Sequence, residues 1–188
     1  ATLVGRKFLQ IYPRSKLVPD GMKLLARALR GQGDFSEAIN IYEDLLARSS
    51  EKAEVHYFLG ETFSEINQLA DAVQAYQRAI ETYDRQEKLI PEYLQNAYFH
   101  LGTSLFKLNR FGPAMEALKS ASELFPDNPL RDWADFLMIE SLEKLGDPSR
   151  ITEGLNKLVK TENGDDLTRQ AAESRVKIRE WEKQLKEG

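Results

Sequence analysis

Side chains able to catalyse a reaction or to bind a metal are few in this chain. Its histidines are His56 and His100, and cysteine is absent. The segment ENGDD at residues 162–166 holds three carboxylates, but it lacks the ligand spacing of a calcium loop and is typical of a turn before a helix capped by Asp165 or Asp166. No zinc-protease, nucleophile-elbow or phosphate-loop motif occurs. We therefore expect no catalytic residue, no metal and no cofactor, and we interpret the histidines as packing or surface residues.

The clearest charged pattern is a basic trio. Lys23, Arg27 and Arg30 are spaced four and three residues apart, so on a helix their side chains share one face and can converge on one anion. The alternative is an ordinary solvated helix face. Residues 1–52 hold nine Lys or Arg against six Asp or Glu, whereas the whole chain has a net charge of -4. The net negative charge of the chain argues against nucleic acid as a partner. The sequence also has no aromatic stacking platform and no groove-reading motif.

These charged residues must be positioned by helices. Apolar residues recur three and four positions apart, as in Leu59, Phe63 and Ile66, which is the period of an amphipathic helix. The residues between them are good helix formers, and no segment alternates as a strand does. A short polar turn at Asn67-Gln68 separates two such helices, so we expect them to pack as an antiparallel hairpin.

The hairpin recurs along the chain with a period of about 34 residues. Its copies share small and large residues at fixed places, and these are Ala38-x3-Tyr42-x2-Leu45, Leu59-Gly60 with Ala72-x3-Tyr76-x2-Ala79, and Leu101-Gly102 with Ala114-x3-Leu118-x2-Ala121. A degenerate fourth copy aligns residues 144–146 with residues 107–109. We interpret the small residues as the contact points at which paired helices approach closely.

This pattern resembles the signature of the tetratricopeptide repeat (TPR) family, W-x2-L-G-x2-Y followed by A-x3-F and Pro. The resemblance implies an all-α, right-handed superhelical solenoid of antiparallel helix pairs with a C-terminal capping helix. The expected segments are the second helix of a truncated repeat at 1–13, repeats at 19–52, 53–94 (with an extended end) and 95–128, a degenerate hairpin at 129–161, and the capping helix at 165–187, with Ala171, Ile178 and Trp181 on one side.

In this family the first helices of successive repeats line a concave groove that receives a protein or peptide. The resemblance therefore implies a partner-binding set, which is Lys23, Arg27, Arg30, Tyr57, Glu61, Asn96, Phe99, Thr103 and Trp133. Four further groove positions are Phe106, Phe136, Glu140 and Glu143, and for the two phenylalanines we favour packing against the neighbouring repeat. We expect Tyr57 and Phe99 to face the groove.

The pair Lys23-x3-Arg27 is similar to the basic pair with which some chaperone-binding members hold the C-terminal carboxylate of a peptide. The asparagines that complete that clamp are not at the equivalent sites, because the following copy has Tyr57 and Glu61. We therefore do not predict a chaperone clamp.

The first 45 residues are also similar to bacterial cell-envelope TPR proteins, namely the periplasmic coordinator of the Tol-Pal system and the outer-membrane assembly lipoprotein. The motifs are Phe8-Leu9-x2-Tyr12-Pro13-x-Ser15 and Gly33-Asp34-Phe35-x2-Ala38-Ile39. This similarity implies a periplasmic location, with the cytoplasm as the alternative. No apolar run reaches the roughly 20 residues of a membrane span, so we expect no direct membrane insertion.

We therefore expect a non-enzymatic module that binds a protein or peptide partner in the groove. The alternative is a structural or oligomerisation segment of a larger TPR protein, in which a homo-oligomer could form through apolar surface left open on the half-repeat at 1–13 and through the helix of Trp181. The sequence begins without Met, and we expect an upstream segment to have been removed.

Overall fold

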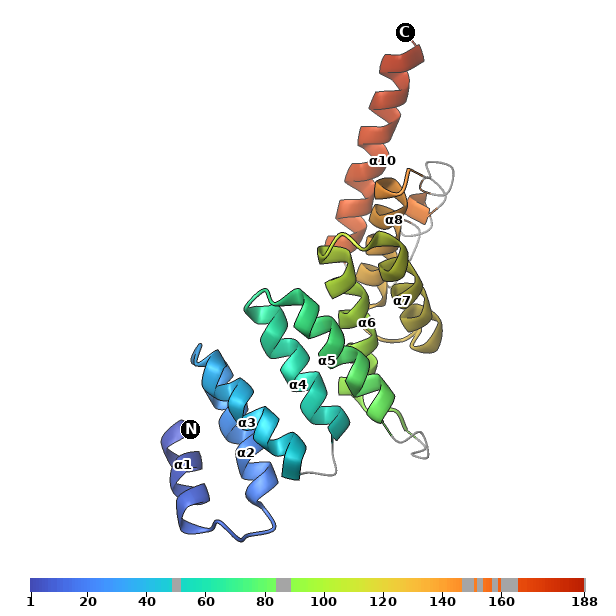
Figure 1. Ribbon diagram of the computed structural model, residues 1–188. Helices are drawn as coiled ribbons and strands as arrows, with labels where there is room; N and C mark the ends of the chain where they lie inside the picture. Colours follow the sequence, from blue (N-terminus) through green and yellow to red (C-terminus); the bar gives the residue numbers. More distant parts are fainter. Residues whose placement is uncertain are drawn as a thin grey trace. The chain divides into compact units, whose positions relative to one another are not determined.

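The described part of the chain is helical throughout and contains no strand (Figure 1). The computed structural model describes residues 1–48, 52–83, 89–146, 151, 154–156, 159 and 166–187, without the side chains of residue 167 and residues 181–187. The sequence interpretations that concern Asp165 and the side chain of Trp181 lie outside the described residues. The expectation of an all-α chain is confirmed.

The chain divides into two compact units, Ala1–Ala97 and Tyr98–Gly188, and each is described by itself. The helices of the first unit are α1 (Thr2–Ile11), α2 (Val18–Arg30), α3 (Phe35–Arg48), α4 (Lys52–Glu65) and α5 (Leu69–Thr82). The boundary falls within α6 (Glu92–Lys107), and the second unit continues with α7 (Phe111–Leu124), α8 (Arg131–Lys144) and α10 (Asp166–Glu187). No helix among the described residues is long and apolar enough to cross a membrane.

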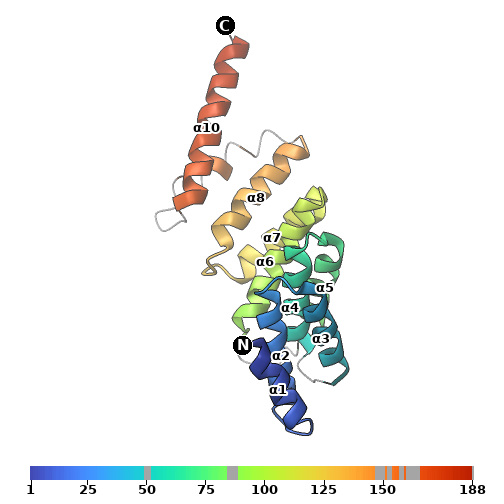
Figure 2. The same cartoon turned by 90° about the vertical axis from the view of Figure 1, so that its left-hand side faces the viewer.

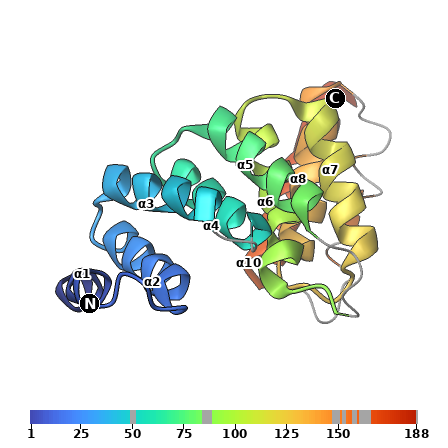
Figure 3. The ribbon, with the colours of Figure 1, turned by 60° about the horizontal axis from the view of Figure 1, so that its bottom comes forward.

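In the first unit, α2 pairs with α3 and α4 pairs with α5, while α2 and α4 also contact each other (Figure 3). The pairs are close because a glycine faces a large side chain. A Cβ on Gly60 of α4 would lie 2.6 Å from the ring of Tyr76 on α5. Ala72 and Ala79 flank that tyrosine and are fully buried. The predicted contact between small and large residues therefore forms where α4 and α5 cross.

A residue in the left-handed region follows each of the helices α2, α4, α6 and α8. The φ angles are 86° at Gly33, 59° at Asn67, 58° at Asn109 and 75° at Gly146. At Asn67 the following N–H, of Gln68, donates to the carbonyl of Phe63 at 2.8 Å. This arrangement satisfies a carbonyl at the end of the first helix and reverses the chain within two residues. The same turn conformation thus recurs after α2, α4, α6 and α8.

In the second unit the same close approach joins α6 to α7. A Cβ on Gly102 would lie 2.5 Å from the side chain of Leu118. A second core lies between α8 and α10 (Figure 2). There Ile139 and Phe136 of α8 pack with Ala172 of α10. Helix α10 therefore covers α8 through an apolar patch near its N-terminal end.

Candidate partner-binding surfaces

The residues predicted to bind a partner fall into two sets, one in each unit. Lys23, Arg27, Arg30, Tyr57, Glu61 and Asn96 belong to the first unit, on α2, α4 and the start of α6. Phe99, Thr103 and Trp133 belong to the second unit, on α6 and α8. We name the first set with Glu54, Phe58 and Glu65 the ladder face, and the second set with Phe136, Glu140 and Glu143 the Trp133 face.

The basic trio is already engaged on the ladder face. Lys23 Nζ lies 2.8 Å from Glu54 Oε2, and Arg30 Nη1 lies 2.7 Å from Glu61 Oε2. A third carboxylate, that of Glu65, lies 3.4 Å from Arg30 Nε. The expectation that the trio converges on one external anion is therefore wrong for Lys23 and Arg30. The physical reason is that the next first helix, α4, carries carboxylates directly opposite them.

Arg27 differs from its two neighbours. Its side chain is exposed, and its Cζ lies 5.2 Å from the centroid of the Phe58 ring on α4. Such a cation–π contact holds the guanidinium over the aromatic face, and its N–H groups can still donate to a further acceptor. Arg27 is thus the member of the trio placed to receive an acidic group from a partner.

Tyr57 is a buried residue that supports the ladder face through a hydrogen bond. Its side chain is buried, and its hydroxyl donates to Glu61 Oε1 at 3.0 Å. Asn96 also hydrogen-bonds to Tyr57, and the Tyr93 ring centroid lies 5.9 Å away. Burial and the charge of Glu61 raise the pKa of Tyr57 well above its ordinary value, so the group stays a neutral donor. Tyr57 is therefore a support for Glu61 and not the open aromatic contact expected from the sequence.

The charge of Arg30 is stabilised in its ionised form. Burial alone would lower the pKa of the Arg30 guanidinium, but the hydrogen bond and charge of Glu61 outweigh burial, so the pKa is raised. Burial also raises the pKa of Tyr42, beneath this pair, to about 12. The ion pairs of Lys23 and Arg30 hold these side chains in place, which reduces the freedom that they would lose when a partner binds.

On the Trp133 face the exposure of one aromatic residue, Phe99, differs from expectation. Phe99 is 1% exposed and packs in the core with Leu118 and Phe125, so the prediction that it faces a groove is wrong. Thr103 donates its hydroxyl to the Phe99 carbonyl at 3.0 Å. Trp133 is 43% exposed, while its ring is stacked on Phe136 with centroids 5.4 Å apart. Trp133 is therefore both accessible and held in place.

Helix α10 occupies two groove positions of the fourth copy. Arg175 donates to both carboxylate oxygens of Glu140, at 3.0 and 2.9 Å. Glu143 lies 3.8 Å from both Arg175 and Arg179. Sequence reasoning missed this contact. The sequence nevertheless contains a pattern that could have predicted it. The two arginines are four residues apart, and they follow the two glutamates by about one repeat length.

The histidines do not form a site. His56 is on α4 and His100 on α6, and both are half-buried. Burial and the charges of Arg78 and Lys52 lower the pKa of His56. Within the described ranges, no group of three or more His, Cys, Asp or Glu side chains is arranged to hold a metal ion.

Comparison with known proteins places the repeats within one family. A family model described as tetratricopeptide repeat matches residues 23–87, and another with the same description matches residues 95–128. Together they span more than half of the chain. No curated protein matches the sequence.

Solved structures share the fold at low sequence identity. A crystal structure of MamA has a TM-score of 0.70 and 20% identity, covering 86% of this chain and 81% of its own. A double mutant of MamA RS-1 has a TM-score of 0.69 and 14% identity, with coverages of 86% and 84%. YrrB, described as a TPR protein with an unusual peptide-binding site, has a TM-score of 0.66 and 17% identity, with coverages of 96% and 87%. These likenesses confirm the predicted solenoid class.

Proposed function

Since the chain belongs to the tetratricopeptide repeat family, we propose that it is an interaction scaffold without catalytic activity that binds a protein or peptide partner. The observation that carries this proposal is the exposure of Trp133 on a rigid support. Tryptophan and arginine are the residue types that most often dominate binding energy at interfaces, especially where packing fixes their geometry. Trp133 on Phe136 and Arg27 on Phe58 both have this arrangement.

The chemistry of the two faces indicates the kind of ligand. Trp133 offers a flat apolar ring with a single donor, and it suits an apolar side chain of a peptide. On the ladder face, the charges of Lys23 and Arg30 are neutralised by carboxylates, while Arg27 is exposed. An apolar side chain of a peptide therefore fits Trp133 on the second unit, and an acidic residue fits Arg27 on the first unit. The peptide-binding site in the description of YrrB supports the same class of ligand.

The proposal is tested by selecting peptides and then removing the exposed anchors. A random peptide library displayed on phage is panned against the folded chain, and the affinity of the selected peptide is measured by calorimetry. A peptide that binds the second unit should be weakened about tenfold by Trp133→Ala, and one that binds the first unit should be weakened about tenfold by Arg27→Ala, the effect of a typical interface anchor. Leu145→Ala is the matched control, because Leu145 is also exposed but follows the other end of α8.

Loss of affinity in the anchor variants, with the control unchanged, supports the proposal. Failure to select any peptide, or equal affinity in all variants, contradicts it.

A finer part of the proposal is a role in assembly of the bacterial cell envelope, in the periplasm. Its support is the similarity of the first 45 residues to envelope TPR proteins, carried by motifs such as Phe8-Leu9-x2-Tyr12-Pro13. Cell fractionation of the epitope-tagged full-length protein tests it. Release with the periplasmic contents is the expected result, and recovery with the cytoplasmic contents contradicts it.

A further inference from the structure

Helices α8 and α10 face each other with two matching stripes of side chains. Each stripe follows the spacing i, i+3, i+4 and i+7, which is one face of a helix. The stripes are Phe136, Ile139, Glu140 and Glu143 on α8, and Ala172, Arg175, Val176 and Arg179 on α10. Their apolar members pack in one cluster, and their charged members pair with one another. The stripe on α8 is therefore acidic and the stripe on α10 is basic.

The charged pairs set the register of the two helices. Arg175 donates to both carboxylate oxygens of Glu140, at 3.0 and 2.9 Å, and Arg179 lies 3.8 Å from Glu143. A bidentate pair of this kind fixes the orientation of the arginine as well as its position. We name the stripe of α8 (Phe136, Ile139, Glu140 and Glu143) the acidic seat. In this structure the acidic seat is occupied by α10.

The apolar cluster beneath the acidic seat depends little on α10. Its described buried members are Phe136, Ile139, Leu142, Ile151, Leu155 and Ala172, of which Ala172 comes from α10. Ala171 and Val176 of α10 pack at the edge of the cluster and are partly buried. Burial of these small side chains removes much less apolar area from water than burial of a phenylalanine or leucine does. The five larger members can stay packed together when α10 leaves.

The ion pairs also hold α10 with little free energy. Arg175 is 40% exposed, and Glu143 is 37% exposed. Pairs between partly exposed groups contribute little to stability, because water screens the charges and ordering the long side chains costs entropy. Helix α10 is thus held in a defined register by weak contacts, which is the condition under which one element opens without the rest of the fold.

We propose that α10 is an exchangeable occupant of the acidic seat, and that a basic amphipathic helix of a partner protein takes its place. The partner helix carries a small apolar residue at the position of Ala172 and two basic residues spaced as Arg175 and Arg179 are. Binding of this helix releases α10. The acidic seat takes a basic ligand, so this inference goes beyond the proposed function.

Charge and shape determine the kind of partner. Glu140 and Glu143 carry charge of the same sign as nucleic acids and anionic lipid surfaces, which are therefore repelled. A basic helix in the register of α10 pairs with both carboxylates and covers the apolar members of the seat. A second copy of the chain offers the same helix, and exchange of α10 between two copies is one outcome of the test.

The test uses a probe taken from the chain itself. The probe is a fluorescent peptide of residues 166–187, and the matched control peptide carries Arg175→Glu and Arg179→Glu. Both peptides are titrated with the wild-type chain and with a chain that carries the same two substitutions. In the wild type the tethered α10 competes at an effective concentration on the order of millimolar. In the variant, two glutamates of α10 face the carboxylates of the acidic seat, and the seat is vacated.

Binding is followed by fluorescence anisotropy. We expect the probe to bind the Arg175/Arg179 variant at least about tenfold more tightly than it binds the wild-type chain. The control peptide should bind neither chain measurably. Addition of Glu140→Gln and Glu143→Gln to the variant should weaken probe binding by at least about tenfold, because the two charges that select a basic helix are then absent.

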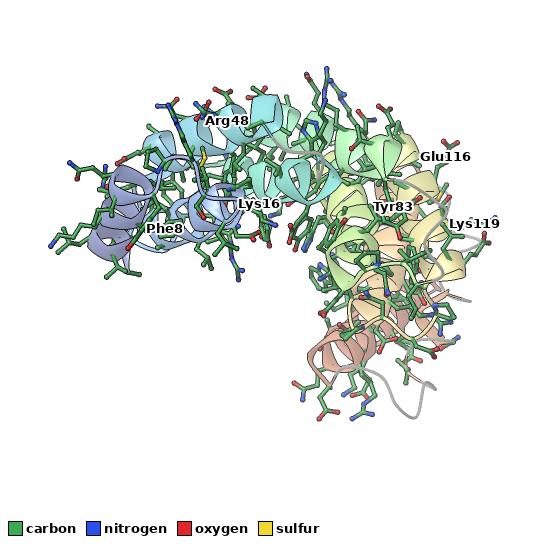
Figure 4. The ribbon with its side chains drawn as sticks, turned by 90° about the horizontal axis from the view of Figure 1, so that it is seen from below. Phe8, Lys16, Arg48, Tyr83, Glu116 and Lys119 are labelled. Carbon is green, nitrogen blue, oxygen red and sulfur yellow. The ribbon has the colours of Figure 1, made fainter. Side chains whose placement is uncertain are left out.

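A matched control chain carries Lys119→Glu and Lys177→Glu, which change the net charge by the same amount. Lys119 on α7 (labelled in Figure 4) and Lys177 on α10 are exposed, and both lie outside the two stripes. This chain should bind the probe as weakly as the wild type does. Hydrogen exchange of the wild type gives a second measurement, in which the amides of residues 172–179 should exchange at least about tenfold faster than those of residues 136–143.

Four results overturn the proposal. They are equal affinity of the probe for the variant and the wild type, equal affinity of the variant for the two peptides, exchange of α8 and α10 at one rate, and unfolding of the whole second unit in the variant. A wild-type dimer in sedimentation that the probe dissociates overturns it as well, because the seat then receives α10 of a second copy. None of these measurements uses a peptide selected for Trp133 or Arg27, so failure of this inference is distinguishable from failure of the proposed function.

Discussion

Arg30 and Glu61 are 31 residues apart in sequence, and Nη1 of the arginine lies 2.7 Å from Oε2 of the glutamate. The same separation joins Lys23 to Glu54 and Arg6 to Glu37. It is three residues shorter than the 34-residue period, so each basic residue meets the carboxylate about one helical turn earlier in the next repeat. This spacing links neighbouring repeats through both first and second helices.

The Arg30–Glu61 pair should couple the stability of α2 to that of α4. We expect a double-mutant cycle with Arg30→Gln and Glu61→Gln, measured by urea unfolding, to give a coupling energy of about 1 kcal/mol. The pair is mostly shielded from water and is supported by Tyr57, which reduces screening. The exposed Arg48–Asp44 pair is the control, with an expected coupling of about 0.3 kcal/mol. Equal couplings for the two pairs would contradict this expectation.

Two buried tyrosines should respond unequally to loss of the hydroxyl. Tyr57→Phe removes a donor from Glu61 and is expected to lower the free energy of unfolding by about 1 kcal/mol. Tyr42→Phe should change it by less than about 0.5 kcal/mol, because the buried Tyr42 hydroxyl makes no hydrogen bond to the described residues. Denaturant unfolding of both variants gives the comparison. A larger loss for Tyr42→Phe than for Tyr57→Phe would show that the hydroxyl of Tyr42 has a partner.

The glycines at the helix crossings should not tolerate a methyl group. Gly60→Ala would place Cβ 2.6 Å from the buried ring of Tyr76. We expect a net loss of about 2 kcal/mol, since the overlap outweighs the roughly 1 kcal/mol gain in helix propensity. Gly31→Ala is the control, because its Cβ would make ordinary contacts at 3.6 Å. Thermal unfolding of the two variants measures the difference, and equal melting temperatures would mean that α4 and α5 can move apart freely.

The histidine of α4 should make stability depend on pH. Burial and the nearby charges of Arg78 and Lys52 hold the pKa of His56 below its ordinary 6.5, so the folded state binds fewer protons than the unfolded state. Stability therefore rises with pH between the lowered folded value and about 6.5, and this contribution is complete above that pH. His56→Gln should flatten the dependence when urea midpoints are compared at pH 5, 6, 7 and 8. If the pH dependence of stability is unchanged in the variant, other titratable groups cause it.

The sequence determined the helix pairs and their crossing points. The period of three and four residues is a local property of one helix, and the 34-residue repeat fixed which second helix each first helix meets. That is why the approach of Gly60 to Tyr76, and of Gly102 to Leu118, could be predicted from spacing alone. The small residues leave few alternative crossing points for a helix pair, because only they allow two helix axes to come so near.

The tertiary structure decided which side chains remain available to a partner. A pattern on α2 places Lys23 and Arg30 on one face, but it does not show that α4 presents carboxylates to both. Phe99 occupies a groove position in the repeat numbering, yet packing with Phe125 and Leu118 buries it. These outcomes depend on the angle and register at which one repeat lies against the next. Contacts between residues about 20 to 36 positions apart set that geometry, and the periodicity of a single helix carries no information about it.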